Sequence, residues 1–180
     1  MLFNLLYPLA DDYSIFNLFR YLTFRTGAAV MTALLISFIV GPPLIRWLRS
    51  KQVRGQPIRE DGPAQHIVAK QGTPTMGGFL ILLALSVSTL LWADLGNRFV
   101  WAVLLVTAGF GLIGFADDYL KVTRANTRGL SGKLKLVLEL IVAVIAALWI
   151  MSFQPTAIAT HLALPFVKDL LLNLGIFFIP

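Results

Sequence analysis

Long apolar runs with almost no charged residues constrain this chain more than any other feature of its sequence. Three of these runs carry no charge: Thr26–Ile45, Gln71–Ala93 and Phe99–Ala116. A fourth, Leu136–Thr160, contains Glu139 as its one charged residue. A helix needs about 20 apolar residues to cross the roughly 30 Å hydrocarbon core of a bilayer. The runs have about that length, so the sequence predicts four transmembrane helices.

Composition supports a membrane protein. Of the 180 residues, 57% are hydrophobic and 13% are charged, whereas a soluble domain carries about 25% charged residues. This balance excludes an ordinary soluble enzyme or binding module, and also a disordered chain. The sequence has no cysteine, which rules out disulfides, thiolate metal sites and a cysteine nucleophile.

A fifth apolar run begins at Leu170 and reaches Pro180, which is too short to span a bilayer. We therefore expect an all-α, polytopic membrane protein with four transmembrane helices and the start of a fifth. The expected spans are 26–45, 74–93, 99–116 and 136–155. Residues 1–180 would form a single membrane domain of a larger protein. Residues 1–10 lack the basic residues with which a secretory signal begins. We therefore interpret residues 1–20 as an interfacial segment.

The net charge of +6 is explained by topology. Eleven of the 15 basic residues lie in two loops, 46–73 and 117–135, that fall on the same side of the membrane. Because basic loops stay in the cytoplasm, both loops are predicted to be cytoplasmic and the N-terminus external. The charge therefore needs no nucleic-acid partner, and none is expected.

The pair Asp117-Asp118 stands where the third predicted span ends. Acidic residues at membrane depth are rare and are candidates for function, and two adjacent carboxylates at a helix C-terminus favour a cation such as Mg²⁺. Successive helical side chains point about 100° apart, which allows the two carboxylates different roles. The alternative is a solvated helix end in which Asp117 pairs with Lys121.

A second candidate opens the second span. Thr73 suits an N-cap and Pro74 the first helical position, so the positive end of a helix would lie beside Lys70 and favour phosphate. The alternative is a capped span with Lys70 as a topological anchor. His66, in the same loop, is interpreted as a possible contact to a polar substrate or as a solvated residue.

The start of the fourth span supplies Lys133 and Lys135, which with Lys121 can reach phosphates at the membrane surface. This segment lacks the residue spacing of the Walker phosphate-binding loop. We expect Glu139 to pair with Lys135 rather than to act in catalysis. The Gly109–Gly114 segment matches a dinucleotide fingerprint, but it lies inside an apolar span. We therefore interpret the small residues Ala108, Gly111 and Gly114 as a helix-packing seam.

Three strings resemble the phospho-N-acetylmuramoyl-pentapeptide transferase family. Asp61–His66 (DGPAQH) with Lys70–Gly78 (KQGTPTMGG) resembles its first signature, and Phe115–Lys121 (FADDYLK) resembles its second. Tyr21–Arg25 (YLTFR) also fits. The strings occur in the family's order and cover the chain as about the N-terminal half of a member.

The resemblance implies a ten-span fold in the bacterial cytoplasmic (inner) membrane, with a tendency to form homodimers. It implies transfer of phospho-MurNAc-pentapeptide from UDP-MurNAc-pentapeptide to undecaprenyl phosphate, with Mg²⁺. The products would be UMP and the first lipid-linked precursor of peptidoglycan, the material for cell shape and division. A third catalytic aspartate, which is the main metal ligand, would lie beyond Pro180.

The same resemblance assigns roles to individual residues. Asp117 would deprotonate or orient the lipid phosphate, and Asp118 would support the metal and the diphosphate. The residues that would hold phosphates are Lys70, Thr75, Lys121 and Lys133. Phosphoryl transfer depends on positioning and charge neutralisation, which agrees with these residue types.

Three alternatives remain open at this stage. The first is an enzyme that transfers a different N-acetylhexosamine phosphate to a polyprenyl phosphate. The second is a transporter or channel subunit, against which stands the lack of a series of polar groups across the predicted spans. The third is a noncatalytic membrane fragment that binds a partner or inhibitor of the full enzyme.

Overall fold

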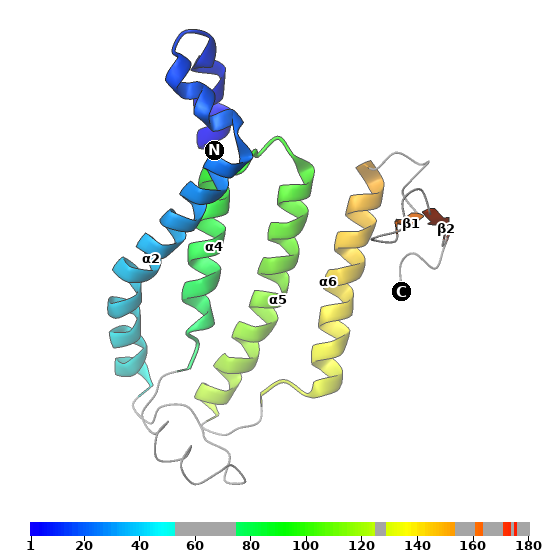
Figure 1. Cartoon of the computed structure of the whole chain (residues 1–180). Coiled ribbons are helices and arrows are strands. Elements are labelled where there is room, and N and C mark those ends of the chain that lie inside the picture. The colour runs from blue at the N-terminus through cyan, green and yellow to red at the C-terminus, as the bar shows by residue number, and fades with distance from the viewer. Residues whose placement is uncertain (53–74, 125–128, 154–160, 164–170, 174, 176–180) are drawn as a thin grey trace.

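The computed structural model describes residues 1–52, 75–124, 129–153, 161–163, 171–173 and 175. Four long helices lie side by side in chain order and form a single row (Figure 1). The described elements are α1 (Leu2–Leu6), the 3-10 helices η1 (Tyr7–Asp11) and η2 (Ser14–Arg20), α2 (Leu22–Lys51), α4 (Gly78–Trp92), α5 (Arg98–Thr123), α6 (Gly132–Phe153), β1 (His161–Ala163) and β2 (Leu171–Asn173).

The helices confirm a polytopic, helical membrane protein. Helices α2, α5 and α6 are long and apolar enough to cross a bilayer, and α4 is apolar but has 15 residues. Few side chains are buried within the described part of the chain, and large apolar residues cover the outer faces of α2 and α6. Lipid would cover such faces in a membrane. The buried apolar residues among those described are Leu48, Ala84, Ala102, Ile113 and Ala146.

Helix α4 begins later than the sequence predicted. Its first residue is Gly78 and its N-cap is Gly77, so the prediction of a helix from Pro74 was wrong. Met76 has a φ of 73°, a left-handed conformation that an α-helix does not contain. The chain therefore turns at Met76 before the helix starts. Thr73 and Pro74 themselves lie outside the described residues.

Helix α5 continues past the predicted end of its span at Ala116 and ends at Thr123. The apolar run marks where the bilayer core would end, but a helix can continue into the polar region beyond it. An i,i+4 ion pair between Asp117 and Lys121 supports the additional turns. Asp117 and Asp118 consequently lie inside the helix, and the expectation that they stand at its C-terminus was wrong.

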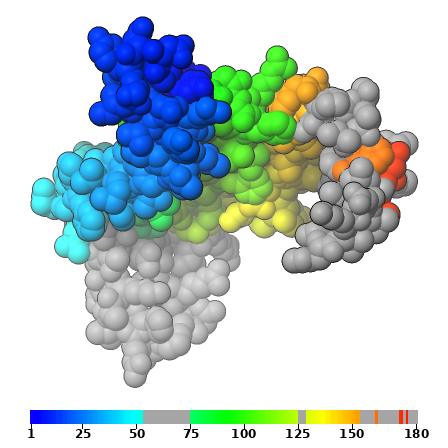
Figure 2. All heavy atoms as spheres, turned by 45° about the horizontal axis from the view of Figure 1, so that its top comes forward, coloured from blue at the N-terminus to red at the C-terminus, as the bar shows by residue number. Residues whose placement is uncertain are grey.

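The N-terminal segment packs on the C-terminal end of α4. The amino group of Met1 donates to the carbonyl oxygens of Leu90 at 2.8 Å and Ala93 at 3.2 Å. The Asn4 amide donates to Asp94 at 2.8 Å. These bonds satisfy carbonyls that a helix end leaves without partners. Residues 1–20 thus stand out from one end of the helix row, as Figure 2 shows in dark blue.

Two short strands follow α6. β1 pairs antiparallel with β2, with His161 opposite Asn173. Within the apolar run that starts at Leu170, the structure therefore has a strand at Leu171–Asn173, where the sequence predicted the start of a helix. Strand pairing satisfies the backbone groups of these residues.

Glycines of α5 allow its neighbours to approach closely. A Cβ placed on Gly109 would lie 2.7 Å from Val142 Cγ1 in α6, and one placed on Gly111 would lie 2.5 Å from Leu82 Cδ1 in α4. The two glycines thus face opposite neighbours. The interpretation of small residues as a packing seam is confirmed for Gly111, whereas a Cβ on Gly114 would have no neighbour within 4 Å. The close approach at Gly109 was not predicted.

This difference predicts the outcome of matched substitutions. Gly109→Ala and Gly114→Ala change helix propensity equally, so any difference between them reports the contact with Val142. Because valine is stiff at χ1, we expect Gly109→Ala to unfold with a free energy roughly 1–3 kcal/mol below that of Gly114→Ala. Unfolding in detergent micelles measures the difference, and equal stabilities would contradict the observed packing.

Candidate functional site

Polar groups from all four long helices, or from residues next to them, meet around Asp117 and Asp118. This end of the row lies opposite the N-terminal segment (Figure 1). Gln52 directly follows α2 and Thr75 precedes α4. Asp117, Asp118 and Lys121 belong to α5. The Leu130 amide, from the segment before α6, completes the group. We call these six residues the aspartate cluster.

Asp117 uses both carboxylate oxygens. Oδ2 accepts a hydrogen bond from Lys121 Nζ at 2.6 Å, and Oδ1 accepts one from the Leu130 backbone N–H at 2.8 Å. The side chain is 14% exposed. Hydrogen bonds to an ionised carboxylate are about twice as strong as bonds between neutral groups. Asp117 therefore holds the start of α6 against α5.

Asp118 is held differently. Its Oδ2 accepts a hydrogen bond from the Thr75 hydroxyl at 3.1 Å, and its Oδ1 lies 3.6 Å from Lys121 Nζ. The side chain is 33% exposed, more than twice the exposure of Asp117. The two neighbouring carboxylates thus have different partners, and Lys121 lies between them and offsets their repulsion.

The ion pair between Asp117 and Lys121 is the contact expected of a solvated helix end. However, a solvated carboxylate at a helix end would not also accept a backbone N–H from a segment 13 residues further along the chain. The half-buried Asp117 and its contact with Leu130 therefore indicate a cluster that joins distant segments rather than a simple surface pair.

Sequence reasoning missed two members of the site. Gln52 is 8% exposed and bonds to the backbone of Thr75. Gly129 lies against Asp117, because a Cβ at this position would overlap the Asp117 carboxylate and lie 3.0 Å from Lys121 Cε. The signal for Gly129 is its place at the first position of Gly129–Lys135 (GLSGKLK), the glycine- and lysine-containing segment at the start of the fourth predicted span. Nothing in the sequence pattern marks Gln52.

The other predicted residues are distributed as follows. Lys133 lies exposed in the first turn of α6, and Lys135 lies near enough to Asp117 to attract its charge. Within the described residues, both ion pairs involve Lys121, so the predicted pairing of Lys135 with Glu139 was wrong. Lys70 and His66 lie outside the described residues.

The carboxylates present suit one kind of metal site. The described residues contain no group of three or more His, Asp or Glu side chains that could enclose an ion. Mg²⁺ does not need such a group, because it is commonly held by one or two carboxylates together with substrate phosphates and water. Asp118, with its more open Oδ1, is the group in the cluster best placed for this.

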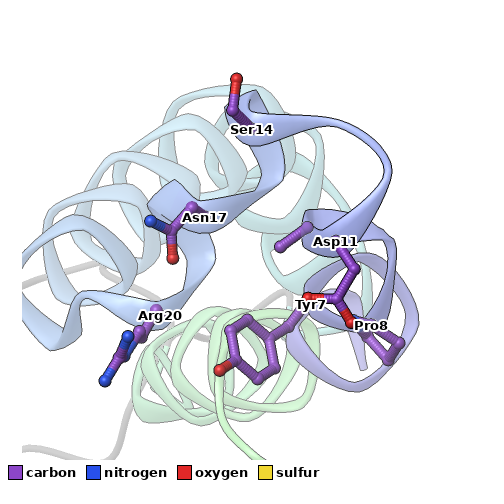
Figure 3. A pocket seen from close by; sticks show the side chains of 7 residues that line it. Tyr7, Pro8, Asp11, Ser14, Asn17 and Arg20 are labelled. Atoms are coloured by element: carbon purple, nitrogen blue, oxygen red, sulfur yellow. The ribbon is translucent and has the colours of Figure 1, made fainter.

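A separate hollow of about 320 Å³ lies in the N-terminal segment, far from the aspartate cluster along the helices. Figure 3 shows Tyr7 and Asp11 on one side of it and Asn17 and Arg20 on the other. Its labelled side chains are all exposed. It contains none of the residues that the sequence singled out for chemistry.

Proteins similar to this chain include phospho-N-acetylmuramoyl-pentapeptide-transferases. Residues 70–82 match the pattern described as phospho-N-acetylmuramoyl-pentapeptide-transferase signature 1. The chain is 59% identical over 178 residues to the phospho-N-acetylmuramoyl-pentapeptide-transferase of Granulibacter bethesdensis, an alignment that covers 99% of this chain and 49% of the relative.

Two further relatives have the same name. Identity is 57% with the protein of Maricaulis maris, covering 99% of this chain and 50% of the relative. Identity is 56% with the protein of a Ruegeria species, and the alignment covers 96% of this chain and 48% of the relative. The chain therefore spans about half the length of the curated relatives that it matches. The resemblance stated from the sequence motifs is confirmed.

The position of Gly129 predicts a second matched comparison. Gly129→Ala must displace the Asp117 carboxylate from the Leu130 N–H, whereas a Cβ on Gly132 meets nothing within 4 Å. We expect Gly129→Ala to lower the free energy of unfolding by roughly 1–3 kcal/mol, and Gly132→Ala to change it by less than about 0.5 kcal/mol. Thermal unfolding in detergent measures both, and a neutral Gly129→Ala would show that Asp117 is not confined as described.

Proposed function

The chain belongs to the phospho-N-acetylmuramoyl-pentapeptide-transferase family, of whose members it spans about half the length, and we propose the function of the protein that contains it. That protein transfers phospho-MurNAc-pentapeptide from UDP-MurNAc-pentapeptide to undecaprenyl phosphate. The products are a lipid-linked peptidoglycan precursor and UMP. The observation that carries the proposal is the aspartate cluster, found in a chain that is 59% identical to a transferase of this name.

The reaction needs a phosphate oxygen of the lipid to attack the diphosphate of the nucleotide sugar. Asp117 orients the lipid phosphate, and its Oδ2 accepts the phosphate's proton when one is present. Lys121 now occupies this oxygen at 2.6 Å, so it turns toward the incoming phosphate as the substrate binds. Lys121 then neutralises charge on the phosphates instead of on Asp117, which is the kind of electrostatic support that phosphoryl transfer requires.

Asp118 would hold Mg²⁺ together with substrate phosphates and a further aspartate of the full-length protein. When bound, the ion would supply positive charge to the diphosphate and to the leaving UMP. Thr75 donates its hydroxyl to Asp118 Oδ2, which leaves Oδ1 as the oxygen available to a metal ion. Thr75 can also donate to a phosphate when Asp118 is engaged by the metal.

Other residues extend the phosphate-binding surface. Lys133, which is exposed in the first turn of α6, supplies positive charge to the substrate phosphates, and so does Lys70. His66 contacts the polar part of the nucleotide sugar. The loops 46–73 and 117–135 face the cytoplasm of a bacterium across its inner membrane, the N-terminal segment lies in the periplasm, and the full-length protein forms a homodimer. The opposite placement of residues 1–20 and the aspartate cluster along the helices supports this topology.

Substrate choice tests the proposed activity. We expect the full-length protein, purified in detergent with undecaprenyl phosphate and Mg²⁺, to release UMP from UDP-MurNAc-pentapeptide and not from UDP-GlcNAc. Chromatography of UMP and of the lipid product measures both reactions. Turnover of UDP-GlcNAc alone would instead assign the protein to a different sugar-phosphate transferase, and no UMP from either nucleotide would contradict the proposal.

Removal of the Asp117 charge tests its role. Asp117→Asn keeps the size of the side chain but removes the proton acceptor, so we expect product formation to fall at least about 100-fold while the protein still inserts and folds. Asp12→Asn, in the exposed N-terminal segment, removes an equal charge far from the cluster and should have the wild-type rate. A wild-type rate in Asp117→Asn would remove this residue from the mechanism.

A further inference from the structure

Gln52 is a buried polar residue in a position where burial needs an explanation. It follows the last residue of α2, and its backbone N–H donates to Leu48 O at 2.9 Å. Its side chain does not extend into solvent, since the residue is 8% exposed. A buried amide is costly unless its donor and its acceptor are both satisfied. The side chain must therefore have specific partners.

Both partners belong to the backbone of one residue, Thr75. The Thr75 N–H donates to Gln52 Oε1 at 2.9 Å, and Gln52 Nε2 donates to Thr75 O at 3.3 Å. Two bonds to one residue fix its orientation as well as its position. The next residue, Met76, has a positive φ of 73°, a conformation that needs support from its surroundings. Gln52 supplies this support from the neighbouring helix.

The Thr75 side chain connects Gln52 to Asp118. Its hydroxyl donates to Asp118 Oδ2 at 3.1 Å. Gln52, Thr75 and Asp118 thus form a continuous series of hydrogen bonds from α2 through the start of α4 to α5. Gln52 touches neither Asp117 nor Asp118 in this series, so any effect it has on them must pass through Thr75.

We propose that Gln52 is a positioning residue, which holds Thr75 so that the Thr75 hydroxyl fixes the orientation of the Asp118 carboxylate. This inference rests on the proposed function for its kinetic consequences, but not for its structural ones. Without Gln52, Thr75 loses its orientation and Asp118 is free to rotate toward Lys121, which already lies 3.6 Å from Oδ1. Asp118 Oδ1 would then pair closely with Lys121 instead of being available to a metal ion.

The test uses near-isosteric variants of the full-length protein. Gln52→Met keeps the length of the side chain and removes both hydrogen bonds, and Thr75→Val removes the hydroxyl. We expect each variant to lower kcat about 10- to 100-fold, with a smaller change in KM for the nucleotide sugar, and to raise the Mg²⁺ concentration needed for half-maximal rate. Gln52→Glu keeps the acceptor for the Thr75 N–H and should fall between wild type and Gln52→Met.

The double variant separates positioning from a merely structural role. If Gln52 acts through the Thr75 hydroxyl, then Gln52→Met in the Thr75→Val background should lower kcat by no more than about twofold further. Multiplication of the two single effects, or a wild-type kcat in Gln52→Met, would overturn the proposal. Ser88→Ala is the matched control, because Ser88 is 5% exposed and bonds within its own helix; it should keep the wild-type kcat.

Hydrogen exchange gives a readout that does not need activity. The Thr75 amide is protected by Gln52 Oε1, so its exchange rate should rise about tenfold in Gln52→Met and remain unchanged in Ser88→Ala. Unchanged exchange in Gln52→Met would contradict the structural part of the proposal. If wild type made no lipid product but the exchange result held, the proposed function would fail and the Gln52–Thr75 contact would stand.

Discussion

The Asp117 carboxylate is the interaction on which the arrangement of this chain depends. Asp117 is a charged group on a helix that otherwise consists largely of apolar residues, and it is mostly shielded from water. Such a group is costly unless its charge and its hydrogen-bonding capacity are satisfied. Lys121 provides the charge and Leu130 provides a backbone donor. The need to satisfy one carboxylate thus determines how the chain returns from α5 to α6.

The rest of the row is held together by close approach rather than by a large apolar core. The described helices bury few side chains, and in a membrane the apolar effect does not distinguish a neighbouring helix from lipid. Contact therefore depends on small residues such as Gly109 and Gly111, and on polar contacts at the ends of the helices. At one end of the row, Met1 and Asn4 make hydrogen bonds to the end of α4 and the residues after it. At the other end, the aspartate cluster links the helices.

The division of labour between the two aspartates follows from this arrangement. Asp117 is enclosed and linked to α6, whereas Asp118 is linked to the start of α4 and is more exposed. Lys121 contacts both carboxylates, so a change in its partners affects Asp117 and Asp118 together. In the proposed function, a substrate phosphate would compete with the two carboxylates for Lys121.

The sequence was sufficient for features that depend on local pattern. Apolar run length predicted the helices, and the rarity of acids at membrane depth identified Asp117 and Asp118. Features that depend on contacts between distant segments could not be predicted in this way. Gln52 bonds to Thr75, which is 23 residues away, and Gly129 lies against Asp117, which is 12 residues away. The sequence predicted a helix from Pro74, but Met76 has a left-handed conformation. The local preference of proline for a helix start takes no account of the hydrogen bonds that Thr75 makes with Gln52 and Asp118.

The most direct test of this account is a high-resolution electron cryomicroscopy map of the full-length protein in a lipid nanodisc with a non-hydrolysable UDP-MurNAc-pentapeptide analogue and Mg²⁺. The account predicts diphosphate density beside Lys121 and Asp118, with Asp117 Oδ1 still within hydrogen-bond distance of the Leu130 N–H. Diphosphate density at the opposite end of the helices, or Asp117 turned away from both Lys121 and Leu130 without a phosphate in place, would contradict it.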